Sequence, residues 1–500
     1  MYAQCVVRSA TLFGVEAIPV EVEVVISNGL PGFSIVGMPD AAIQEARERV
    51  RAAIRACGFS MPVEKVVVNL APGALRKTGS GFDLPIALGI LAATKQIAPE
   101  LIEKHLFVGE LSLDGKVRGV CGLLAHEMCA QALGIGIVCA ETSEGFVDIA
   151  GVENLTCASL ADFRQGNFKS AQVVSVNRKN SSLDFAEVAG HEVAKRAMQI
   201  AAAGRHGILM MGPPGSGKTM LASRLSSILP PLTEAEALET ALVYSIVGDD
   251  TSSLLARVRP FRKPHHSATL AGLIGGGRPL RPGEVSLAHN GVLFLDELAE
   301  FKPAVLQGIR QPMESGEVSL IRADNKVVFP AKFMMIAATN PCPCGYYGDR
   351  EITCTCSLPQ IRSYQNRIGG PLMDRIDIHI DIWRTDPNQI LHPCKGKSSA
   401  ELREGVLRAR EYADYRRSCK GEVESLDATS ALLRSCALSS ENQAFLESMA
   451  RMNYMSGRGI MRVLAIARTV ADIDEQSRVL KEHLCEALSF RLREGIGGNV

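Results

Sequence analysis

The 500-residue sequence lacks the bulk features that direct a protein to a membrane or to nucleic acid. Its 54 lysine and arginine residues balance 54 aspartate and glutamate residues, so no net field draws it to a phosphate backbone or an anionic lipid surface. No apolar run approaches the roughly 18 residues that cross a bilayer, and the first residues lack the basic-then-apolar layout of a secretory signal. We expect a cytoplasmic protein without membrane contact, whose nucleic-acid contacts, if any, depend on local basic groups.

Cysteines are frequent, at 14, but ten are single residues in apolar surroundings, where buried reduced thiols are expected. The other four form two Cys-x-Cys pairs: Cys342, Cys344, Cys354 and Cys356. Four thiolates across a glycine-containing loop suit tetrahedral Zn²⁺, although the one-residue spacing is tighter than in common zinc modules. Disulfides are the alternative, and a cytoplasmic setting disfavours them. We expect structural zinc.

A phosphate-binding loop is the most informative motif that is present. It comprises Gly212, Pro213, Pro214, Gly215, Ser216, Gly217, Lys218 and Thr219. An apolar run, 208–211, precedes it and a helical pattern follows, which is the context in which backbone N–H groups and a helix N-terminus bind phosphates. A chance match is the alternative, and this context disfavours it. Lys218 is predicted to neutralise the β- and γ-phosphates of ATP, and Thr219 to bind Mg²⁺.

Two further apolar strands end in polar residues suited to a Mg-ATP site. The strand 292–295 is followed by Asp296, predicted to hold the Mg²⁺ shell, and by Glu297, predicted to orient the attacking water. The strand 333–339 is followed by Asn340, placed to sense the γ-phosphate. Each acid alone is a common strand ending, but the combination with the phosphate loop predicts an ATPase.

Composition and periodicity divide the chain into four parts. Residues 1–165 alternate β-rich runs with helical patterns and predict a mixed α/β domain. Residues 166–184 are polar and aperiodic, as in a linker. Residues 185–385 surround the phosphate loop with strands and helices, and residues 386–500 are almost wholly helical.

These three strand ends resemble the AAA+ class, and longer segments resemble the magnesium-chelatase-like AAA+ ATPases of the YifB/ComM type. The resemblance is carried by 187–191, 201–204, 259–266, 282–297 and 370–379. It implies an α/β AAA+ P-loop core with the four-cysteine insertion at 342–356, an all-α lid, and ATP with Mg²⁺ as cofactors. His191 departs from the glutamine expected in this family, which leaves its role open.

The same resemblance assigns two arginines to catalysis. Arg375 falls where an arginine finger reaches a neighbouring subunit's site, which implies a homo-oligomer, a hexameric ring by expectation. A surface ion network of Arg375 with Asp374 and Asp377 is the alternative. Arg458 resembles a sensor 2 arginine of the lid, with Arg462, one turn later, as the competing candidate.

Four basic residues are candidates for DNA contact. The segment 316–330 predicts a β-hairpin around Ala-Asp-Asn, and such a hairpin lines the pore in related ring helicases, so that Arg322 and Lys326 follow a phosphate backbone. A solvated hairpin with ordinary charges is the alternative. Arg262 and Lys263, near the glycine-rich 275–278, form a second candidate loop. The adjacent His265 and His266 are expected to be structural, since no nearby carboxylate or cysteine completes a metal site.

The N-terminal domain is similar in sequence to the Lon peptidase domain, which implies an α+β, ribosomal S5-like fold. Its segments 78–88 and 107–126 carry the similarity. The Ser-Lys dyad is not matched: the lysine position falls on or near Leu124, and the serine position near Gly79 rather than Ser80. Lys77 and Lys116 do not occupy the matching place, so we expect a scaffold or DNA-contacting collar.

Three functions follow from these expectations. The first is a hexameric, ATP-hydrolysing DNA motor that promotes branch migration or unwinding of branched DNA in recombination and natural transformation, with recombination proteins as possible partners. The second is a magnesium-chelatase-type ATPase subunit that remodels a protein partner. The third is a Lon-like ATP-dependent protease, which the missing dyad opposes.

Overall fold

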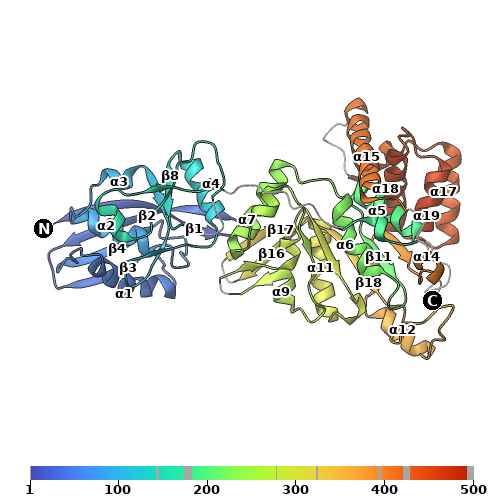
Figure 1. Ribbon diagram of the computed structural model, residues 1–500, viewed down its shortest axis with the longest axis horizontal. Helices are drawn as coiled ribbons and strands as arrows, with labels where there is room; N and C mark the ends of the chain where they lie inside the picture. The colour runs from blue at the N-terminus through green and yellow to red at the C-terminus, as the bar shows by residue number, and fades with distance from the viewer. Residues whose placement is uncertain are drawn as a thin grey trace.

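The computed structural model describes residues 2–141, 146–173, 183–277, 279–322, 325–391, 396–420 and 428–491. The N-terminal domain, the ATPase core and a helical C-terminal region follow one another along the long axis of the molecule (Figure 1). Among the described helices, none combines the length and apolar character needed to cross a bilayer. The chain is thus a mixed α/β protein, as its sequence patterns predict.

Two four-stranded sheets with α-helices packed on them form the N-terminal domain. One sheet has the order β1-β2-β4-β3 and the other β10-β9-β8-β5. The strands are β1 (Ala3–Phe13), β2 (Glu16–Ser27), β3 (Gly32–Val36), β4 (Lys65–Ala71), β5 (His105–Phe107), β8 (Gly136–Cys139), β9 (Asn154–Thr156) and β10 (Lys169–Ser170), with β6 (Glu110–Leu111) and β7 (Val117–Arg118) as a separate pair. The helices are α1 (Ala41–Ala56), α2 (Asp83–Ala93), α3 (Glu100–Glu103) and α4 (Leu123–Leu133). Since β10 pairs with β9, the domain's sheet extends into the segment expected to be a linker, of which 174–182 lies outside the described residues.

Helix α1 shows how the sequence directs this domain. The carboxylate of Asp40 accepts a hydrogen bond from the N–H of Ile43 at the helix start, and the helix stops before Gly58, whose φ is 71°. The apolar positions that predict a helix at 42–54 nearly all face inward. Their burial packs α1 into the same core as the first sheet.

A five-stranded parallel sheet forms the ATPase core, in the order β12-β15-β18-β11-β19. Its strands are β11 (Ile208–Met211), β12 (Phe261–Arg262), β15 (Val292–Leu295), β18 (Met334–Thr339) and β19 (Ile378–Asp381). The surrounding helices are α5 (Glu192–Gly204), α6 (Lys218–Ile228), α7 (Glu234–Val247), α8 (Ser252–Leu255), α9 (Leu270–Ile274), α10 (Glu284–Leu287), α11 (Pro303–Ser315), α12 (Leu358–Asn366) and α13 (Gly370–Met373). The three central strands are buried along their whole length, so their continuous apolar runs form the middle layer.

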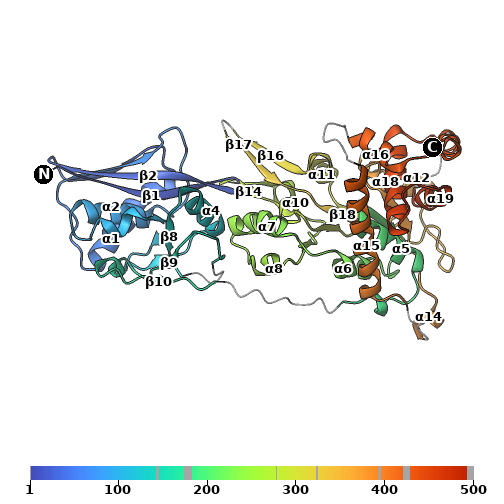
Figure 2. The same ribbon diagram turned by 90° about the horizontal axis from the view of Figure 1, so that it is seen from above.

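Two hairpins extend from this core. The predicted one is β16 (Glu317–Arg322) paired with β17 (Asn325–Pro330), and the second is β13 (Gly275–Gly276) paired with β14 (Arg281–Pro282). In Figure 2 the β16–β17 hairpin projects from the core on the side facing the N-terminal domain. There Gly14, in the turn between β1 and β2, lies against Val327, since a Cβ on Gly14 would be 3.3 Å from Val327 Cγ1.

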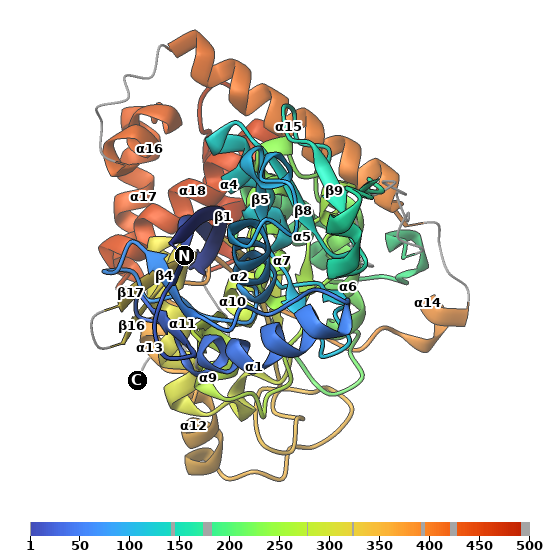
Figure 3. The ribbon, with the colours of Figure 1, turned by 90° about the vertical axis from the view of Figure 1, so that its left-hand side faces the viewer.

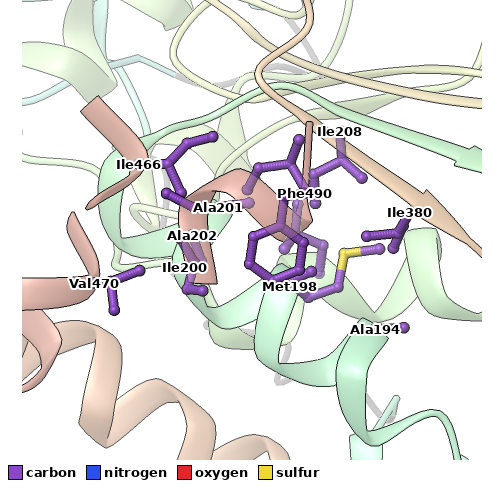
Figure 4. Packing of buried hydrophobic residues seen from close by; sticks show 14 of the residues in the cluster. Ala194, Met198, Ile200, Ala201, Ala202, Ile208, Ile380, Ile466, Val470 and Phe490 are labelled. Atoms are coloured by element: carbon purple, nitrogen blue, oxygen red, sulfur yellow. The ribbon is translucent and has the colours of Figure 1, made fainter. Parts of the chain in front are cut away.

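The C-terminal region is helical and packs firmly on the core. Its helices are α14 (Pro387–Leu391), α15 (Ser399–Lys420), α16 (Ala428–Cys436), α17 (Ser440–Met452), α18 (Gly457–Ile473) and α19 (Lys481–Ser489). Seen from the N-terminal end, α15 runs along one side of the molecule and α12 lies on the opposite side (Figure 3). Met198 of α5, Ile466 of α18 and Phe490 belong to one apolar cluster shared by core and lid (Figure 4). Core and lid are therefore fixed to each other by burial of apolar surface.

A second shared cluster joins the N-terminal domain to the core. Leu124 of α4 is buried with Leu232, Ala237 and Tyr244 in or near α7. Its backbone N–H also donates to the hydroxyl of Ser245, at 3.2 Å. Leu124, on or near which the Lon resemblance places the lysine, is thus a buried contact between domains.

Candidate active site

The parallel sheet brings three strand ends to one edge. Met211 is opposite Thr339, and Leu295 is opposite Ala337, so that Gly212, Asp296 and Asn340 follow at the same edge. Side chains at the carboxyl ends of parallel strands converge on a crevice that binds ligands. The three polar residues picked out by the motifs therefore meet.

Two glycines shape the phosphate loop. A Cβ on Gly212 would come 1.9 Å from the carbonyl oxygen of Ile382, and Gly217 has φ 87°, a left-handed conformation, at the start of α6. Any other residue at position 212 would push away the backbone that follows β19, and any other residue at position 217 would strain the turn. The loop therefore keeps its N–H groups and the N-terminus of α6 directed to one point.

Lys218 lies against the loop that precedes it. Its ammonium donates to the carbonyl oxygens of Gly212 and Pro213, both at 2.8 Å, and lies 3.3 Å from Oδ1 of Asn340. Burial lowers the pKa of Lys218 to about 8, against the opposing effect of Asp296. Lys218 and Asn340, the residue that follows β18, thus form one cluster.

The donor set at Asp296 fits a magnesium ion. Thr219 donates its hydroxyl to Oδ2 of Asp296 at 2.9 Å, placing a hydroxyl and a carboxylate side by side as hard oxygen ligands. The ammonium of Lys263 binds the same Oδ2 at 3.0 Å. The carboxylate of Asp296 therefore already binds a cationic group, the ammonium of Lys263.

Glu297 and His266 form a pair, so the expectation that no carboxylate lies near this histidine is wrong. Oε2 of Glu297 lies 3.1 Å from Nδ1 of His266, and the backbone of Glu297 is left-handed, with φ 53°. Lys263 and His266 follow β12, which is parallel to β15, so they reach the same sheet edge. A strand of only two residues leaves no periodic pattern, which is why their place was not evident.

The arginines assigned to catalysis lie elsewhere. Arg375 precedes β19 and therefore lies toward the opposite edge of the sheet from Gly212. Its guanidinium donates to the carbonyl of Pro371 at 2.6 Å and pairs with Glu314 at 2.7 Å. Arg458 also pairs with Glu314, at 3.5 Å. The alternative network with Asp377 is instead made by Arg462.

The four cysteines of the 342–356 segment converge. Their sulfur atoms all lie within 4.8 Å of one another, and three of the separations are 3.3, 3.5 and 3.7 Å. Tetrahedral Zn–S bonds of about 2.3 Å place sulfurs about 3.8 Å apart, so the cluster fits zinc, and all four cysteines are free of disulfides. Burial raises the pKa of Cys344, but hydrogen bonds from the backbone of Tyr346 and Thr355 and from neighbouring thiols lower it to about 6. One ligand is thus readily a thiolate.

This cysteine segment packs on the phosphate loop. Gly345 has φ 88°, and a Cβ there would lie 2.7 Å from Cδ of Pro214. Only glycine permits so close an approach with that backbone. The cluster is therefore placed to brace the loop.

The DNA candidates fall into two groups. Lys326 is exposed on β17, whereas the side chain of Arg322 and Arg278 of the glycine-rich loop lie outside the described residues. Arg262 makes two 2.7 Å hydrogen bonds to Glu284, and Lys263 binds Asp296. His191 donates to or accepts from the hydroxyl of Thr385 at 2.8 Å, beside the phosphate loop. For Arg262 and Lys263 a DNA role stays a prediction.

In the N-terminal domain, the serine and the two lysines considered for a catalytic dyad contact other groups. Ser80 donates its hydroxyl to Glu110, and the buried amine of Lys77 donates to the carbonyl of Pro72, with burial lowering its pKa. Lys116 pairs with Asp114 at the surface, at 3.1 Å. In the described part of this domain, none of these contacts joins a lysine amine to Ser80.

Three family descriptions match the chain in order. Residues 22–143 match "Subunit ChlI of Mg-chelatase", residues 184–390 match "Magnesium chelatase, subunit ChlI", and residues 396–491 match "Magnesium chelatase, subunit ChlI C-terminal". The first range covers part of the N-terminal domain, the second most of the core, and the third most of the helical C-terminal region.

Similarity to individual proteins extends over the whole chain. It is 40% identical over 499 residues to competence protein ComM of Haemophilus influenzae, covering 97% of each chain. It is 40% identical over 493 residues to YifB of Escherichia coli, covering 97% of this chain and 96% of that protein. By contrast, the 67 kDa magnesium-chelatase subunit of Heliobacterium mobile is 29% identical over 192 residues, 33% of this chain.

Proposed function

Because the chain belongs to the YifB/ComM family of magnesium-chelatase-like AAA+ ATPases, we propose that it is an ATP-driven DNA motor. It assembles as a homohexameric ring, moves on branched or single-stranded DNA, and promotes branch migration during recombination and natural transformation. The name of the Haemophilus influenzae relative connects that protein with competence, and its similarity covers 97% of both chains.

One observation carries the proposal of a ring: the catalytic groups lie at two opposite edges of one sheet. Lys218, Asp296 and Glu297 follow β11 and β15, whereas Arg375 precedes β19, which is parallel to β11. An arginine finger supplied by Arg375 would therefore act on the nucleotide of a second copy of the chain, in addition to Lys218 and Lys263 of the binding site itself. Arg458, beside Arg375 on Glu314, belongs to the same contributing edge.

The residues at the binding edge divide the work. Lys218 and the N–H groups of the loop bind the β- and γ-phosphates, Asn340 orients Lys218 toward them, and Glu297 polarises the attacking water. Thr219 and Asp296 hold Mg²⁺, which when bound neutralises charge on the phosphate oxygens. His266 fixes the carboxylate of Glu297.

DNA contact is assigned to the β16–β17 hairpin. Lys326 is exposed there, and Arg322 lies on the other strand, where its backbone is opposite Asn325. Phosphate contacts of this kind give an affinity that falls with salt and does not depend on sequence. The four-cysteine cluster holds a structural zinc ion that braces the phosphate loop, and the Lon-like domain serves as a scaffold.

A chelatase-type motor subunit is the second candidate. The similarity to the Heliobacterium mobile subunit favours a shared ATPase mechanism, but it covers only 33% of this chain. A Lon-like protease is disfavoured by Leu124, which is buried between domains, and by the contact of Ser80 with Glu110.

One assay separates these functions: ATP turnover of the full chain alone, with forked DNA, with single-stranded DNA, and with unfolded protein. A DNA motor is stimulated by DNA and binds it with an affinity that falls as salt rises. Turnover that ignores DNA, together with no DNA binding at moderate salt, rejects the motor. Stimulation by, and cleavage of, unfolded protein would establish the protease instead.

A mixing experiment tests the ring. Lys218→Ala abolishes nucleotide binding, and Arg375→Ala leaves binding intact while removing the finger. Each variant alone is expected to be inactive, and mixing them restores turnover where an intact Arg375 meets an intact loop. Absence of restored turnover at every ratio contradicts action across subunits.

A further inference from the structure

Glu314 joins two arginines that come from different parts of the chain. Its Oε1 lies 2.7 Å from Nη2 of Arg375, in the core, and 3.5 Å from Nη2 of Arg458, at the start of α18 in the lid. A carboxylate between two guanidinium groups attracts both by charge, and the shorter pair, with Arg375, is the stronger. One side chain therefore contacts both arginines and holds Arg375 the more closely.

Arg375 depends on this contact for its orientation. The side chain is only 13% exposed, its Nη1 is held by the carbonyl of Pro371, and its buried Nε has no hydrogen-bond partner in the described structure. Arg458 is 66% exposed and has greater freedom. Without Glu314, Arg375 would keep one anchor at Pro371 and lose the second, so its free end would no longer point in a fixed direction.

Glu314 is also tied to the root of the β16–β17 hairpin. It is the second-last residue of α11, which ends as Gly316 adopts φ 70°. The hydroxyl of Ser315 accepts from the N–H of Glu317 at 3.3 Å, and the carbonyl of Gly316 accepts from the N–H of Ala331 at 2.8 Å. Both strands of the hairpin are thus bonded to the end of α11, so a shift of the hairpin moves Glu314.

Cations line a cavity beside Glu314, although Arg205 and Arg259 already pair with Glu236, and Arg410 donates to backbone carbonyls. The cavity has a volume of about 350 Å³, and Glu314 lines it together with four cations: Arg205, Arg259, Arg410 and Lys332. Phosphate oxygens of a nucleotide carry more charge than one carboxylate and compete for the arginines. When the arginines turn to phosphate, Glu314 stays beside a cavity lined by cations, and their charge lowers the cost of leaving it unpaired.

We propose that Glu314 is a positioning residue that holds Arg375 and Arg458 for the nucleotide of the neighbouring subunit and links them to the DNA hairpin. The inference rests on the proposed function, because it assumes that these arginines act across subunits. A structural clamp between core and lid is the competing role. The two roles differ in where a substitution of Glu314 acts within a mixed assembly.

The test uses the complementing mixture of full-length chains, Lys218→Ala as arginine donor and Arg375→Ala as ATP-binding acceptor. Glu314→Gln is added either to the donor or to the acceptor. Placed in the donor, it lowers kcat at least about tenfold while KM for ATP changes little, because the finger is misdirected. Placed in the acceptor, whose finger is already absent, it changes turnover less than about twofold.

Equal effects in donor and acceptor, or no effect in either, overturn the proposal and establish a clamp or a neutral residue. If the mixture that lacks Glu314→Gln has no turnover, Arg375 does not act across subunits. The proposed ring mechanism then fails, which is distinct from a failure of the role of Glu314. Glu404→Gln in the donor is the matched control, since it removes a surface carboxylate that pairs with Arg408 on α15. The melting temperature of each variant checks its folding, and Glu314→Asp is the second variant: it keeps the charge and restores part of kcat.

The link to the hairpin has its own readout. In the otherwise unchanged protein, Glu314→Gln reduces the stimulation of turnover by single-stranded DNA toward onefold, while the Kd for DNA stays within about twofold. Stimulation that persists overturns the link. A Kd that rises in proportion also overturns it, because the loss then reflects DNA binding.

Discussion

The ammonium of Lys263 lies 3.0 Å from the carboxylate of Asp296, on the same oxygen that accepts the hydroxyl of Thr219. Lys263 is 45% exposed, so water weakens the pair, which we expect to be worth no more than about 1 kcal/mol. The contact nevertheless sets a cation against the acid that is proposed to hold Mg²⁺.

Replacing Lys263 by methionine should raise the apparent affinity of the site for Mg²⁺. With the competing ammonium removed, the Mg²⁺ concentration for half-maximal ATP hydrolysis should fall about three- to fivefold. A titration of turnover with Mg²⁺ at fixed ATP measures this. Lys302→Met, before α11, serves as the control and should leave the midpoint in place. A raised midpoint would instead identify Lys263 as a phosphate ligand.

Nucleotide affinity should depend on pH through Lys218. Its pKa is lowered to about 8, so below pH 8 the amine is already protonated and binding takes up no proton. Above pH 8, triphosphate binding must first protonate the amine, and the affinity should fall by up to about tenfold per pH unit. Binding of a fluorescent ATP analogue at about pH 7, 8 and 9 measures this in the Glu297→Gln protein.

Lys218→Arg provides the comparison, because a guanidinium stays charged over this range. Its affinity should be lower overall and almost independent of pH. If both proteins show the same slope, the titrating group is not Lys218.

The cysteine cluster should hold about one zinc ion per chain. Cys354→Ser removes a ligand and is expected to release the metal, lower the melting temperature, and weaken ATP binding severalfold, because Gly345 packs on Pro214. Metal analysis of the purified protein and ATP titration measure these effects. Cys485→Ser, at an exposed position, should change none of them. If a metal-free Cys354→Ser protein bound ATP with full affinity, the cysteine cluster would not support the phosphate loop.

Leu124 should stabilise the docking of the N-terminal domain. Its truncation to alanine removes buried apolar contact at α7, and we expect a loss of about 2–4 kcal/mol. Faster amide hydrogen exchange in α7 and a lower melting temperature would show it. Leu133→Ala lies on the same helix at an exposed position and should have little effect. Equal amide hydrogen exchange of α7 in the Leu124→Ala and Leu133→Ala proteins would show that Leu124 does not stabilise the junction between the domains.

Local sequence signals predicted much of the site. The phosphate loop, Asp296 and Asn340 each follow an uninterrupted apolar strand, and the sheet brings them together as expected. Lys263 and His266 were not expected at this edge, because β12 has two residues and no detectable periodicity. The role of Glu314 also has no local signal: its partners are 61 and 144 residues away in sequence, so only the fold brings them together.

The fold was similarly predictable where periodicity is strong. The inward face of α1 and the hairpin at 316–330 follow their patterns. The strand β1 carries polar residues, Arg8 and Ser9 among them, on positions that alternate only in part, so its own sequence gives a weak strand signal. Pairing with β2 along its full length defines it, which is a tertiary effect.

The placement of the catalytic groups at opposite edges of the sheet changes what counts as one enzyme. Each chain carries two half-sites and, on the proposed function, no whole one. An open row of n subunits then contains n − 1 complete centres, and closure into a ring adds the last. Ring closure would therefore be a catalytic event in its own right, and opening the ring to admit DNA would silence one centre at the gap.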